Sequence, residues 1–254
     1  MARVSDPRSV SVDLHCHLLP GLDDGARDLG DALAMAEQAE HDGIEAICAT
    51  PHIRHDHAVR IAELPGRLAE LSAALRAAGS AVEALPGGEV SAGSLDSLDD
   101  AELAVVSLGG GGRWILLEPG PGPLGADLDQ AVRTLNNRGY RAVIAHPERH
   151  PGPDLLPRLA ALTAAGALIQ VTAGFFLEPA TAPGMIALAR AGVVHVLGSD
   201  AHSSRLGRPV ALSAALVKLG TVQPTAAHLR WIGSFAPLAL IAGIDVAPPF
   251  PARV

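Results

Sequence analysis

The sequence predicts an α/β fold in which amphipathic helices alternate with short parallel strands. Three observations support this: helix-like amphipathic segments recur along the chain, a glycine ends each of them, and a short apolar run follows each glycine. Residues 31–43, DALAMAEQAEHDG, are the first such helix, and residues 44–50, IEAICAT, are the strand after it. Short apolar runs of this kind are typical of parallel strands covered on both faces. The pattern is compatible with a barrel and with a doubly wound sheet.

The same unit repeats three more times. The helix predicted at 127–139 places apolar residues at i, i+3, i+4 and i+7, which is the spacing of one buried helical face. Its last residue, Gly139, stands where a left-handed residue ends a helix, as do Gly43, Gly166 and Gly192. The other predicted helices are 155–166 and 183–192. Strands are predicted at 10–15, 44–50, 81–89, 113–118, 140–147, 167–173 and 193–200. The glycines at 109–112 predict a mobile loop.

The composition indicates one globular domain over residues 1–254. Hydrophobic residues make up 48% of the chain and charged residues 18%, which is typical of a folded domain, and no shift in composition marks a boundary. The net charge of −8 argues against nucleic acid as the main partner, because a phosphate backbone requires a basic surface.

The sequence also predicts a cytoplasmic protein without membrane insertion. Cys16 and Cys48 do not make a disulfide framework and are typical of a reducing compartment. Residues 1–10 contain no apolar signal-peptide core. The apolar run at 235–244 is much shorter than the ~20 residues that a spanning helix needs.

Nine imidazole or carboxylate side chains stand at or just after the ends of the predicted strands. The carboxyl ends of parallel strands meet at one end of such a domain, so these side chains are expected to converge. They are His15, His17, Asp24, His52, Glu89, Glu118, His146, Asp200 and His202. Buried ionisable groups cost several kcal/mol each unless something compensates, and divalent cations do so. The sequence therefore predicts a multinuclear catalytic metal site.

The kinds of side chain in this set restrict the metal. Mixed nitrogen and oxygen ligands suit Mn, Zn or Fe better than Ca or Mg alone. The set has no cysteine, which argues against a structural zinc site. His15 and His17 are two residues apart in an extended segment, so both rings can reach one cation. Cys16 then points to the opposite side as a small buried residue.

The motifs resemble a known superfamily. HCHLLPGLDDGARD, ATPH, AHPER and SDAH, with Glu89 and Glu118 between them, resemble the polymerase and histidinol phosphatase (PHP) superfamily from about residue 12 to residue 210. They are most similar to the bacterial manganese-dependent protein-tyrosine phosphatases of capsule and exopolysaccharide loci. The resemblance implies a distorted (β/α)7 barrel with the metal site at the C-terminal ends of the strands. It also implies three divalent metal ions, with Mn as the first expectation and Fe or Zn as alternatives.

The resemblance assigns all nine side chains as metal ligands. The implied partition is a first ion held by His15, His17 and Asp200 with Glu89 bridging, a second held by Glu118 and His146, and a third held by Asp24, His52 and His202. Within LDDG the matching residue is Asp24. Asp23 is therefore expected to cap the turn or to support a ligand.

Arginines near two of the motifs are candidates for binding phosphate. Arg149 in AHPER is the first, because a guanidinium forms paired hydrogen bonds with phosphate oxygens. The resemblance implies a second arginine after SDAH, and Arg208 and Arg205 both stand near its place. Clustered cations would neutralise the charge of a phosphomonoester and activate a water as the attacking hydroxide.

A competing motif predicts a different kind of phosphatase. Residues 48–54, CATPHIR, match the C-x5-R spacing with which cysteine-dependent phosphatases surround a phosphate. The segment has no glycine, and Pro51 removes one backbone donor from such a loop. This alternative also leaves the nine metal-type residues unexplained, so the metal-dependent hypothesis is preferred.

The resemblance thus implies a protein-tyrosine phosphatase that acts on the phosphotyrosine of a bacterial tyrosine kinase. Two alternatives keep the site and change the substrate: a small-molecule phosphatase of the histidinol-phosphatase type, and a PHP phosphodiesterase. A further alternative is a metal-bound binding module without activity.

Five more residues were assigned by their place near the expected site. Phe175 and Phe176 could form a hydrophobic wall for a phenyl ring, although a core position is the main expectation for both. His55, His57 and His150 are expected to be exposed loop residues.

Overall fold

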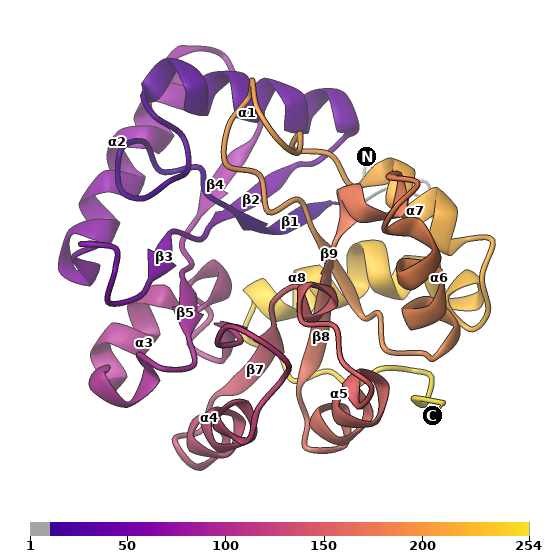
Figure 1. Cartoon of the computed structure of the whole chain (residues 1–254). Helices are drawn as coiled ribbons and strands as arrows, with labels where there is room; N and C mark the ends of the chain where they lie inside the picture. Colours follow the sequence, from indigo (N-terminus) through magenta and orange to yellow (C-terminus); the bar gives the residue numbers. More distant parts are fainter. Residues whose placement is uncertain (1–10, 254) are drawn as a thin grey trace.

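Nine strands and eight α-helices alternate along residues 11–253, the part of the chain that the computed structural model describes (Figure 1). Residues 1–10 and 254 lie outside the described residues, and with them the segment considered for a signal peptide and the first residue of the strand predicted at 10–15. The strands are β1 Val12–Cys16, β2 Ala46–Ala49, β3 His52–Ile53, β4 Glu83–Leu85, β5 Glu89–Ser91, β6 Trp114–Glu118, β7 Arg141–Ile144, β8 Leu168–Thr172 and β9 Val196–Gly198. The helices are α1 Leu29–Asp42, α2 Leu64–Ala77, α3 Asp100–Val106, α4 Ala126–Asn137, α5 Leu155–Ala164, α6 Ala182–Arg190, α7 Ser213–Leu219 and α8 Ala236–Ile241.

All strand pairs among the described residues are parallel, which confirms the predicted α/β class. β1, β2 and β4 form one sheet in that order, and β3, β5, β6, β7, β8 and β9 form the second. A bridge between Cys16 and Ala201 brings the segment after β9 next to β1. The strands therefore curl, and Figure 1 shows helices around the outside of the curl.

The four helices predicted from glycine-terminated patterns are present as α1, α4, α5 and α6. α1 begins after Asp28, whose side chain accepts a hydrogen bond from the backbone N–H of Asp31, and it ends at Gly43 with φ 86°. The other three predicted stop glycines also have positive φ. The sequence patterns missed α3, α7 and α8, which have only six or seven residues each and show too little periodicity. They also missed α2.

The strand predicted at 81–89 is interrupted, and the strand predicted at 44–50 is followed at once by a second short strand. Pro51 separates β2 from β3, and residues 86–88, Pro-Gly-Gly, separate β4 from β5, because proline cannot donate to the ladder. His52 and Glu89 were expected to follow strands, but they begin β3 and β5. The two residues are partners in the register between these strands, so the interruptions place them side by side.

The strands bury one face against α1–α7 and the other against α8. Buried residues on the α8 side form a separate apolar cluster, which we call the floor: Val12, Leu14, Ala46, Cys48, Leu108, Trp114, Leu116, Val143, Ala145, Leu168, Val196, Ala236 and Leu240. Two residues farther along a strand, the side chain on the same face is polar, as in Gln170 after Leu168 and Glu118 after Leu116. The floor therefore lies beneath a layer of polar side chains at the carboxyl ends of the strands.

The prediction of a mobile loop at 109–112 is wrong. Leu108–Gly110 form a short helix, η3, and the backbone N–H of Gly109 donates to Pro86 O at 2.9 Å. Gly109 has φ 65°, and a Cβ added there would lie 2.4 Å from the Cβ of Ile241 in α8. The glycine is needed because the backbone packs directly against α8.

The apolar run at 235–244 lies in and around α8, and its function is packing. A π-helix, η7 (Trp231–Phe235), continues directly into α8, which contributes Ala236 and Leu240 to the floor. The indole N–H of Trp114 donates to Ile244 O at 3.0 Å and ties the end of this segment to β6. Among residues 11–253, no helix combines the length and the apolarity needed to cross a bilayer.

His195, just before β9, makes the stability of the fold sensitive to acid. Its Nδ1 accepts a hydrogen bond from the backbone N–H of Ile169 at 2.9 Å, and burial lowers its pKa to about 3. In the unfolded chain the pKa is about 6.5, so only the unfolded chain takes up the proton as the pH falls below that value. This residue is therefore expected to lower the free energy of unfolding by roughly 1.4 kcal/mol per pH unit between about pH 6 and pH 4.

Urea unfolding of the wild type and of His195→Asn at several pH values measures this contribution. The asparagine oxygen can accept the Ile169 hydrogen bond but does not titrate, so the variant should lose less stability between pH 7 and pH 5. The difference between the two proteins cancels the other titrating groups. Equal losses would show that His195 is protonated in the folded chain.

Candidate metal centre

A one-residue bulge in β1 brings both histidines of the HxH motif to the side of the floor, in the interior of the curl. Between Asp13 and Cys16 the strand advances by three residues, while the paired β2 advances by two. Leu14 before the bulge belongs to the floor, whereas Cys16 after it packs among the residues that face the outer helices. The backbone N–H of His15 donates to Asp13 Oδ1 at 3.1 Å within the bulge. The change of side explains how His15 and Leu14, although adjacent, both face the interior of the curl.

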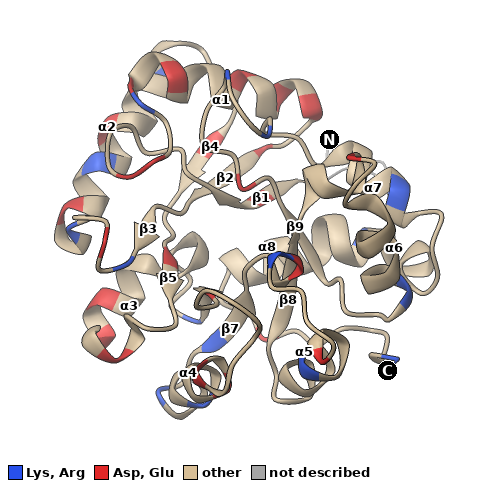
Figure 2. Cartoon of the chain, viewed as in Figure 1, with Lys and Arg blue, Asp and Glu red and all other residues tan. Residues whose placement is uncertain are grey.

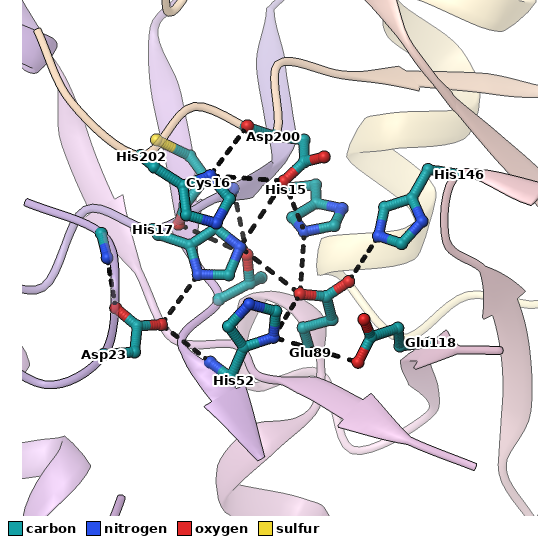
Figure 3. A network of polar contacts seen from close by, with 12 residues as sticks. His15, Cys16, His17, Asp23, His52, Glu89, Glu118, His146, Asp200 and His202 are labelled. Atoms are coloured by element: carbon teal, nitrogen blue, oxygen red, sulfur yellow. Dashed lines mark hydrogen bonds and ion pairs between the residues drawn. The ribbon is translucent and has the colours of Figure 1, made fainter. Parts of the chain in front are cut away.

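All nine predicted side chains lie together in one cluster, and Figure 3 shows most of them. Glu89 is at the centre. Its Oε2 lies 3.3 Å from His15 Nε2, 3.4 Å from His17 Nε2 and 2.9 Å from His52 Nδ1. Its Oε1 lies 2.7 Å from His146 Nε2. One buried carboxylate thus contacts four imidazoles.

The remaining four residues range from the buried Asp200 to the exposed Asp24. Asp24, whose side chain is 59% exposed, places Oδ1 3.4 Å from His52 Nε2 and 3.5 Å from His202 Nε2. Asp200 Oδ1 lies 3.6 Å from His202 Nδ1. Glu118 Oε2 lies 4.0 Å from His52 Nδ1.

The ligand atoms form four overlapping sets. Within each set all ligand atoms lie within 4.8 Å of one another, which is close enough to hold an ion. The sets are His17, Asp24, His52 and His202; His15, His17 and Glu89; His15, His146 and Asp200; and His52, Glu89 and Glu118. This grouping differs from the partition implied by the resemblance: His17 joins Asp24, His52 and His202 as well as His15, and Asp200 is grouped with His15 but not with His17. Glu118 is grouped with His52 and Glu89, and His146 with His15 and Asp200, rather than with each other.

Buried atoms without hydrogen-bond partners test whether these residues fit metal ions. His15 Nε2, His17 Nε2, His52 Nδ1 and Glu89 Oε2 are all buried, and none makes a hydrogen bond within residues 11–253. These are the atoms that converge around Glu89. A buried polar atom without a partner is costly, and several around one point are typical of cation ligands. The donor set fits divalent cations.

Asp23 orients two of these imidazole-bearing residues. Its Oδ2 lies 2.8 Å from His17 Nδ1 and accepts a hydrogen bond from the backbone N–H of His52 at 2.9 Å. Burial alone would lower the pKa of His17, but the hydrogen bond to Asp23 and the nearby carboxylate of Glu89 outweigh it and raise the pKa to about 9. Without a cation, a proton on His17 therefore supplies positive charge between two carboxylates. Asp23 has the supporting place expected for it.

The cluster shifts the pKa values of Glu89 and His202 as well, in both cases toward the form that binds a cation. Burial opposes ionisation of Glu89, but His15 and His146 beside it hold its pKa well below the usual range. Burial and the neighbouring His17 lower the pKa of His202 to about 3, so this imidazole is neutral and can donate a lone pair.

Two of the predicted ligands have unusual backbone conformations. His146 and Asp200 have φ of 30° and 49°, and they are the only residues other than glycine with positive φ within the described range. Each follows a strand, β7 and β9, and the left-handed conformation turns the chain there. Strain of this kind is concentrated at functional sites.

Arg149 and Arg208 lie next to the cluster. Arg149 Nη2 contacts Asp200 Oδ2, and Arg208 Nη2 lies 3.1 Å from the same oxygen. Both guanidiniums also face the ring of Phe175, at 5.5 Å and 5.8 Å from its centroid. Phe175 is half-buried while Phe176 is fully buried, so only the first is available at the site.

Arg205 occupies a different place from Arg208. Its side chain is exposed and lines the mouth of a cavity of about 710 Å³ that Asp24, Arg149, His202 and Arg208 also line. Of the two rival arginines, Arg208 is the one that contacts Asp200.

Several residues at the site were not singled out from the sequence. Gln170 Oε1 lies 3.0 Å from His15 Nδ1 and fixes that ring, and Arg54 Nη1 lies 3.2 Å from Glu118 Oε1. Gln170 could have been found by its strand parity with Leu168, since alternate residues share a face. The prediction of exposure is wrong for two histidines: His57 is half-buried and stacks on His52 at 4.8 Å, and half-buried His150 contacts Gly122 O through Nδ1 at 2.7 Å.

The cysteine-dependent alternative does not fit. Cys48 lies in β2, is fully buried and belongs to the floor. Burial raises the pKa of its thiol to about 12, so a nucleophilic thiolate does not form near neutral pH. Arg54, the other half of C-x5-R, pairs with Asp56 and Glu118.

The sequence was compared with known protein families. It matches the family described as capsular polysaccharide synthesis, CpsB/CapC, over residues 11–221. The chain belongs to the CpsB/CapC family.

Relatives in the CpsB/CapC family agree in sequence and in structure. The tyrosine-protein phosphatase YwqE of Bacillus subtilis is 34% identical over 204 residues, which cover 76% of this chain and 77% of that protein. A crystal structure from a study of YwqE of Bacillus subtilis and CpsB of Streptococcus pneumoniae, described there as metal-dependent tyrosine phosphatases, superimposes with a TM-score of 0.82. That alignment has 29% identity and covers 96% of this chain and 99% of the other.

A wider set of hydrolases shares the fold alone. The dihydropyrimidinase of Brevibacillus agri matches with a TM-score of 0.57 at 11% identity, over 96% of this CpsB/CapC chain and 73% of that enzyme. Such a likeness supports the curled arrangement of parallel strands and says nothing about the reaction.

Proposed function

We propose that this CpsB/CapC protein is a metal-dependent phosphatase that hydrolyses phosphotyrosine in proteins. The observation that carries the proposal is the convergence of three unpartnered buried imidazole nitrogens on the equally unpartnered Oε2 of Glu89, with two arginines at the edge of the same cluster. A phosphatase needs both parts, because cations and guanidiniums together neutralise a phosphate dianion. The relatives named as tyrosine-protein phosphatases support the choice of substrate.

The metal ligands in this proposal are the nine predicted residues, and they hold three divalent ions, with Mn first and Fe or Zn as alternatives. The mixture of imidazole nitrogens and carboxylate oxygens supports these metals. When bound, divalent cations supply Lewis-acid chemistry, since they screen phosphate charge and lower the pKa of water. The four overlapping sets of ligand atoms support more than one ion.

The chain's own residues orient the substrate. Arg149 and Arg208 converge on Asp200 from the cavity side, where their guanidiniums can form paired hydrogen bonds with phosphate oxygens. Phe175 packs against both guanidiniums, and in this proposal its exposed edge forms the apolar wall for a phenyl ring. This arrangement supports an aryl phosphate over an alkyl phosphate. Arg205 lies farther out and is assigned no contact with the reacting phosphate.

The architecture in this proposal is a distorted seven-stranded barrel in a single domain of residues 1–254. Counting β2 with β3 and β4 with β5 as interrupted strands gives seven, and the bridge from Cys16 to Ala201 supports closure between β9 and β1. The site would then lie at the C-terminal ends of the strands. The partner proposed is a bacterial tyrosine kinase, in the cytoplasm, where two free buried cysteines stay reduced. The family description supports a link to capsule synthesis.

Chelation of the purified protein tests the proposed function. Hydrolysis of a phosphotyrosine peptide should be lost in excess chelator and restored by Mn²⁺, while Cys48→Ser should retain activity. Histidinol phosphate and a phosphodiester are assayed in parallel. Hydrolysis of histidinol phosphate alone would refute the protein substrate and keep the metal mechanism. Activity that survives chelation and is lost in Cys48→Ser would refute the metal mechanism.

A further inference from the structure

Two arginines without an assigned function line the mouth of the site. The cavity of about 710 Å³ beside the cluster is lined by four arginines and one carboxylate. Arg149 and Arg208 lie at its inner end next to Asp200. Arg27 and Arg205 line the same cavity and have exposed side chains. We call Arg149 and Arg208 the inner pair, and Arg27 and Arg205 the outer pair. In the proposed function one phosphate dianion binds the inner pair, so the outer pair is free to bind another group.

The outer pair has no partner in the described part of the chain. Among residues 11–253, the guanidiniums of Arg27 and Arg205 take part in no ion pair or hydrogen bond, although their backbone N–H groups do. Most other site arginines are already paired, such as Arg54 with Glu118. Unpaired cations at a cavity mouth attract anions and hold them at close range.

A buried carboxylate holds the two arginine-bearing segments together. Asp31 Oδ2 accepts a hydrogen bond from the backbone N–H of Arg27 at 3.4 Å, and its Oδ1 accepts one from the backbone N–H of Ser204 at 2.9 Å. The hydroxyl of Ser204 also donates to Oδ1 at 2.5 Å. Asp31 thus ties the residue before Arg205 and the backbone of Arg27 to one side chain, so the two segments that carry the outer pair are held next to each other.

α1 supports the second of these segments along its length. Gln38 Nε2 donates to Ser204 O at 2.8 Å, and the backbone N–H of Val210 donates to Gln38 Oε1 at 3.1 Å. One turn farther on, Asp42 Oδ2 accepts from the backbone N–H groups of Leu212 and Ser213 at 2.6 Å and 2.9 Å. Figure 1 shows this segment, in orange, crossing from β9 over α1 toward α7, and Figure 2 shows basic residues on it.

Because the rest of the protein is acidic, the outer pair is a place where an acidic peptide can bind. The chain has a net charge of −8, and Figure 2 shows acidic residues on the outer helices α1 to α4. An acidic peptide is repelled by most of this surface and attracted only where guanidiniums are unpaired.

We propose that Arg27 and Arg205 form a second anion subsite, which binds the carboxylate of an Asp or Glu close to the phosphotyrosine in the substrate. This inference rests on the proposed phosphatase function and specifies its substrate class as acidic phosphotyrosine segments. Leu206, whose side chain is 79% exposed at the same mouth, lies beside the peptide in this arrangement.

Matched phosphotyrosine peptides test the subsite with the Mn²⁺-loaded protein. One set carries Glu at single positions within three residues of the phosphotyrosine, and the other carries Gln at the same positions. At low salt, kcat/KM of the wild type should be about 5-fold higher for the best Glu peptide than for its Gln partner, since two exposed ion pairs contribute on this order. The preference should fall to about 1 in the Arg27→Ala/Arg205→Ala double variant and should decrease with added salt.

The control is Arg76→Ala/Arg190→Ala, which removes the same charge from exposed ends of α2 and α6 and should keep the wild-type preference. Peptides with phosphoserine in place of Glu show whether a phosphate is the preferred second anion. Equal rates on Glu and Gln peptides would overturn the subsite and leave the phosphatase intact. No hydrolysis of any phosphotyrosine peptide would overturn the proposed function itself.

Discussion

Glu89→Gln is expected to lower kcat/KM for a phosphotyrosine peptide on the order of 10³-fold. Glu89 is fully buried, and its two oxygens contact four of the five imidazoles of the cluster. Glutamine keeps the shape, but it removes the negative charge that would balance two cations. It also leaves an amide group facing imidazoles that already lack partners. The loss should appear in kcat and in the metal content per chain, measured by elemental analysis.

The matched control is Glu83→Gln. Glu83 begins β4, on the same interrupted strand as Glu89. Its side chain is exposed, and it lies at the opposite end of this strand from Glu89. This variant should keep full metal content and activity. If Glu89→Gln bound metal and turned over like the control, the carboxylate would not be a ligand.

Removal of either inner arginine should lower kcat/KM by about 10²-fold, because in the proposed site each guanidinium forms paired hydrogen bonds that neutralise the phosphate oxygens and hold them in line for displacement. Arg149→Ala and Arg208→Ala remove a guanidinium that contacts Asp200 and faces Phe175. Arg149→Lys should recover only part of the loss, since an ammonium cannot form the paired hydrogen bonds. Metal content should stay at the wild-type level, which separates this effect from that of Glu89→Gln.

A small aryl phosphate distinguishes the inner arginines from Arg205. It reaches the cluster but not the cavity mouth, so Arg205→Ala should lower its kcat/KM by less than about 3-fold, as expected for one exposed charge. Arg76→Ala serves as the surface control. A loss of about 10²-fold in Arg205→Ala would assign phosphate binding to Arg205 in place of Arg208.

The cluster could be predicted from the sequence because its members are marked by local order. Most of the polar residues stand at or shortly after the end of a short apolar run, and the parallel-strand rule then brings the ends together. The same logic predicted the helices that end at Gly43, Gly139, Gly166 and Gly192, where one residue type marks the stop.

Other features depend on contacts that no local pattern shows. The bulge in β1 changes the side on which residues after Asp13 lie, and only pairing with β2 reveals the extra residue. The packing of Gly109 on Ile241 joins segments more than a hundred residues apart, so a glycine run looked like a loop. The hydrogen bonds from Asp31 to Ser204 likewise need the folded chain.

The floor and the polar layer above it limit the kinds of sequence change that the strands of this family can accept. Both layers occupy alternate residues of the same strands, with Leu168 and Gln170 in β8 as one example. An exchange of one aliphatic residue for another in the floor changes stability and spares every ligand. An insertion or deletion within a strand would exchange the two layers and destroy stability and catalysis together. Length variation among relatives should therefore be confined to connections such as 119–125, while the strands drift only by substitution.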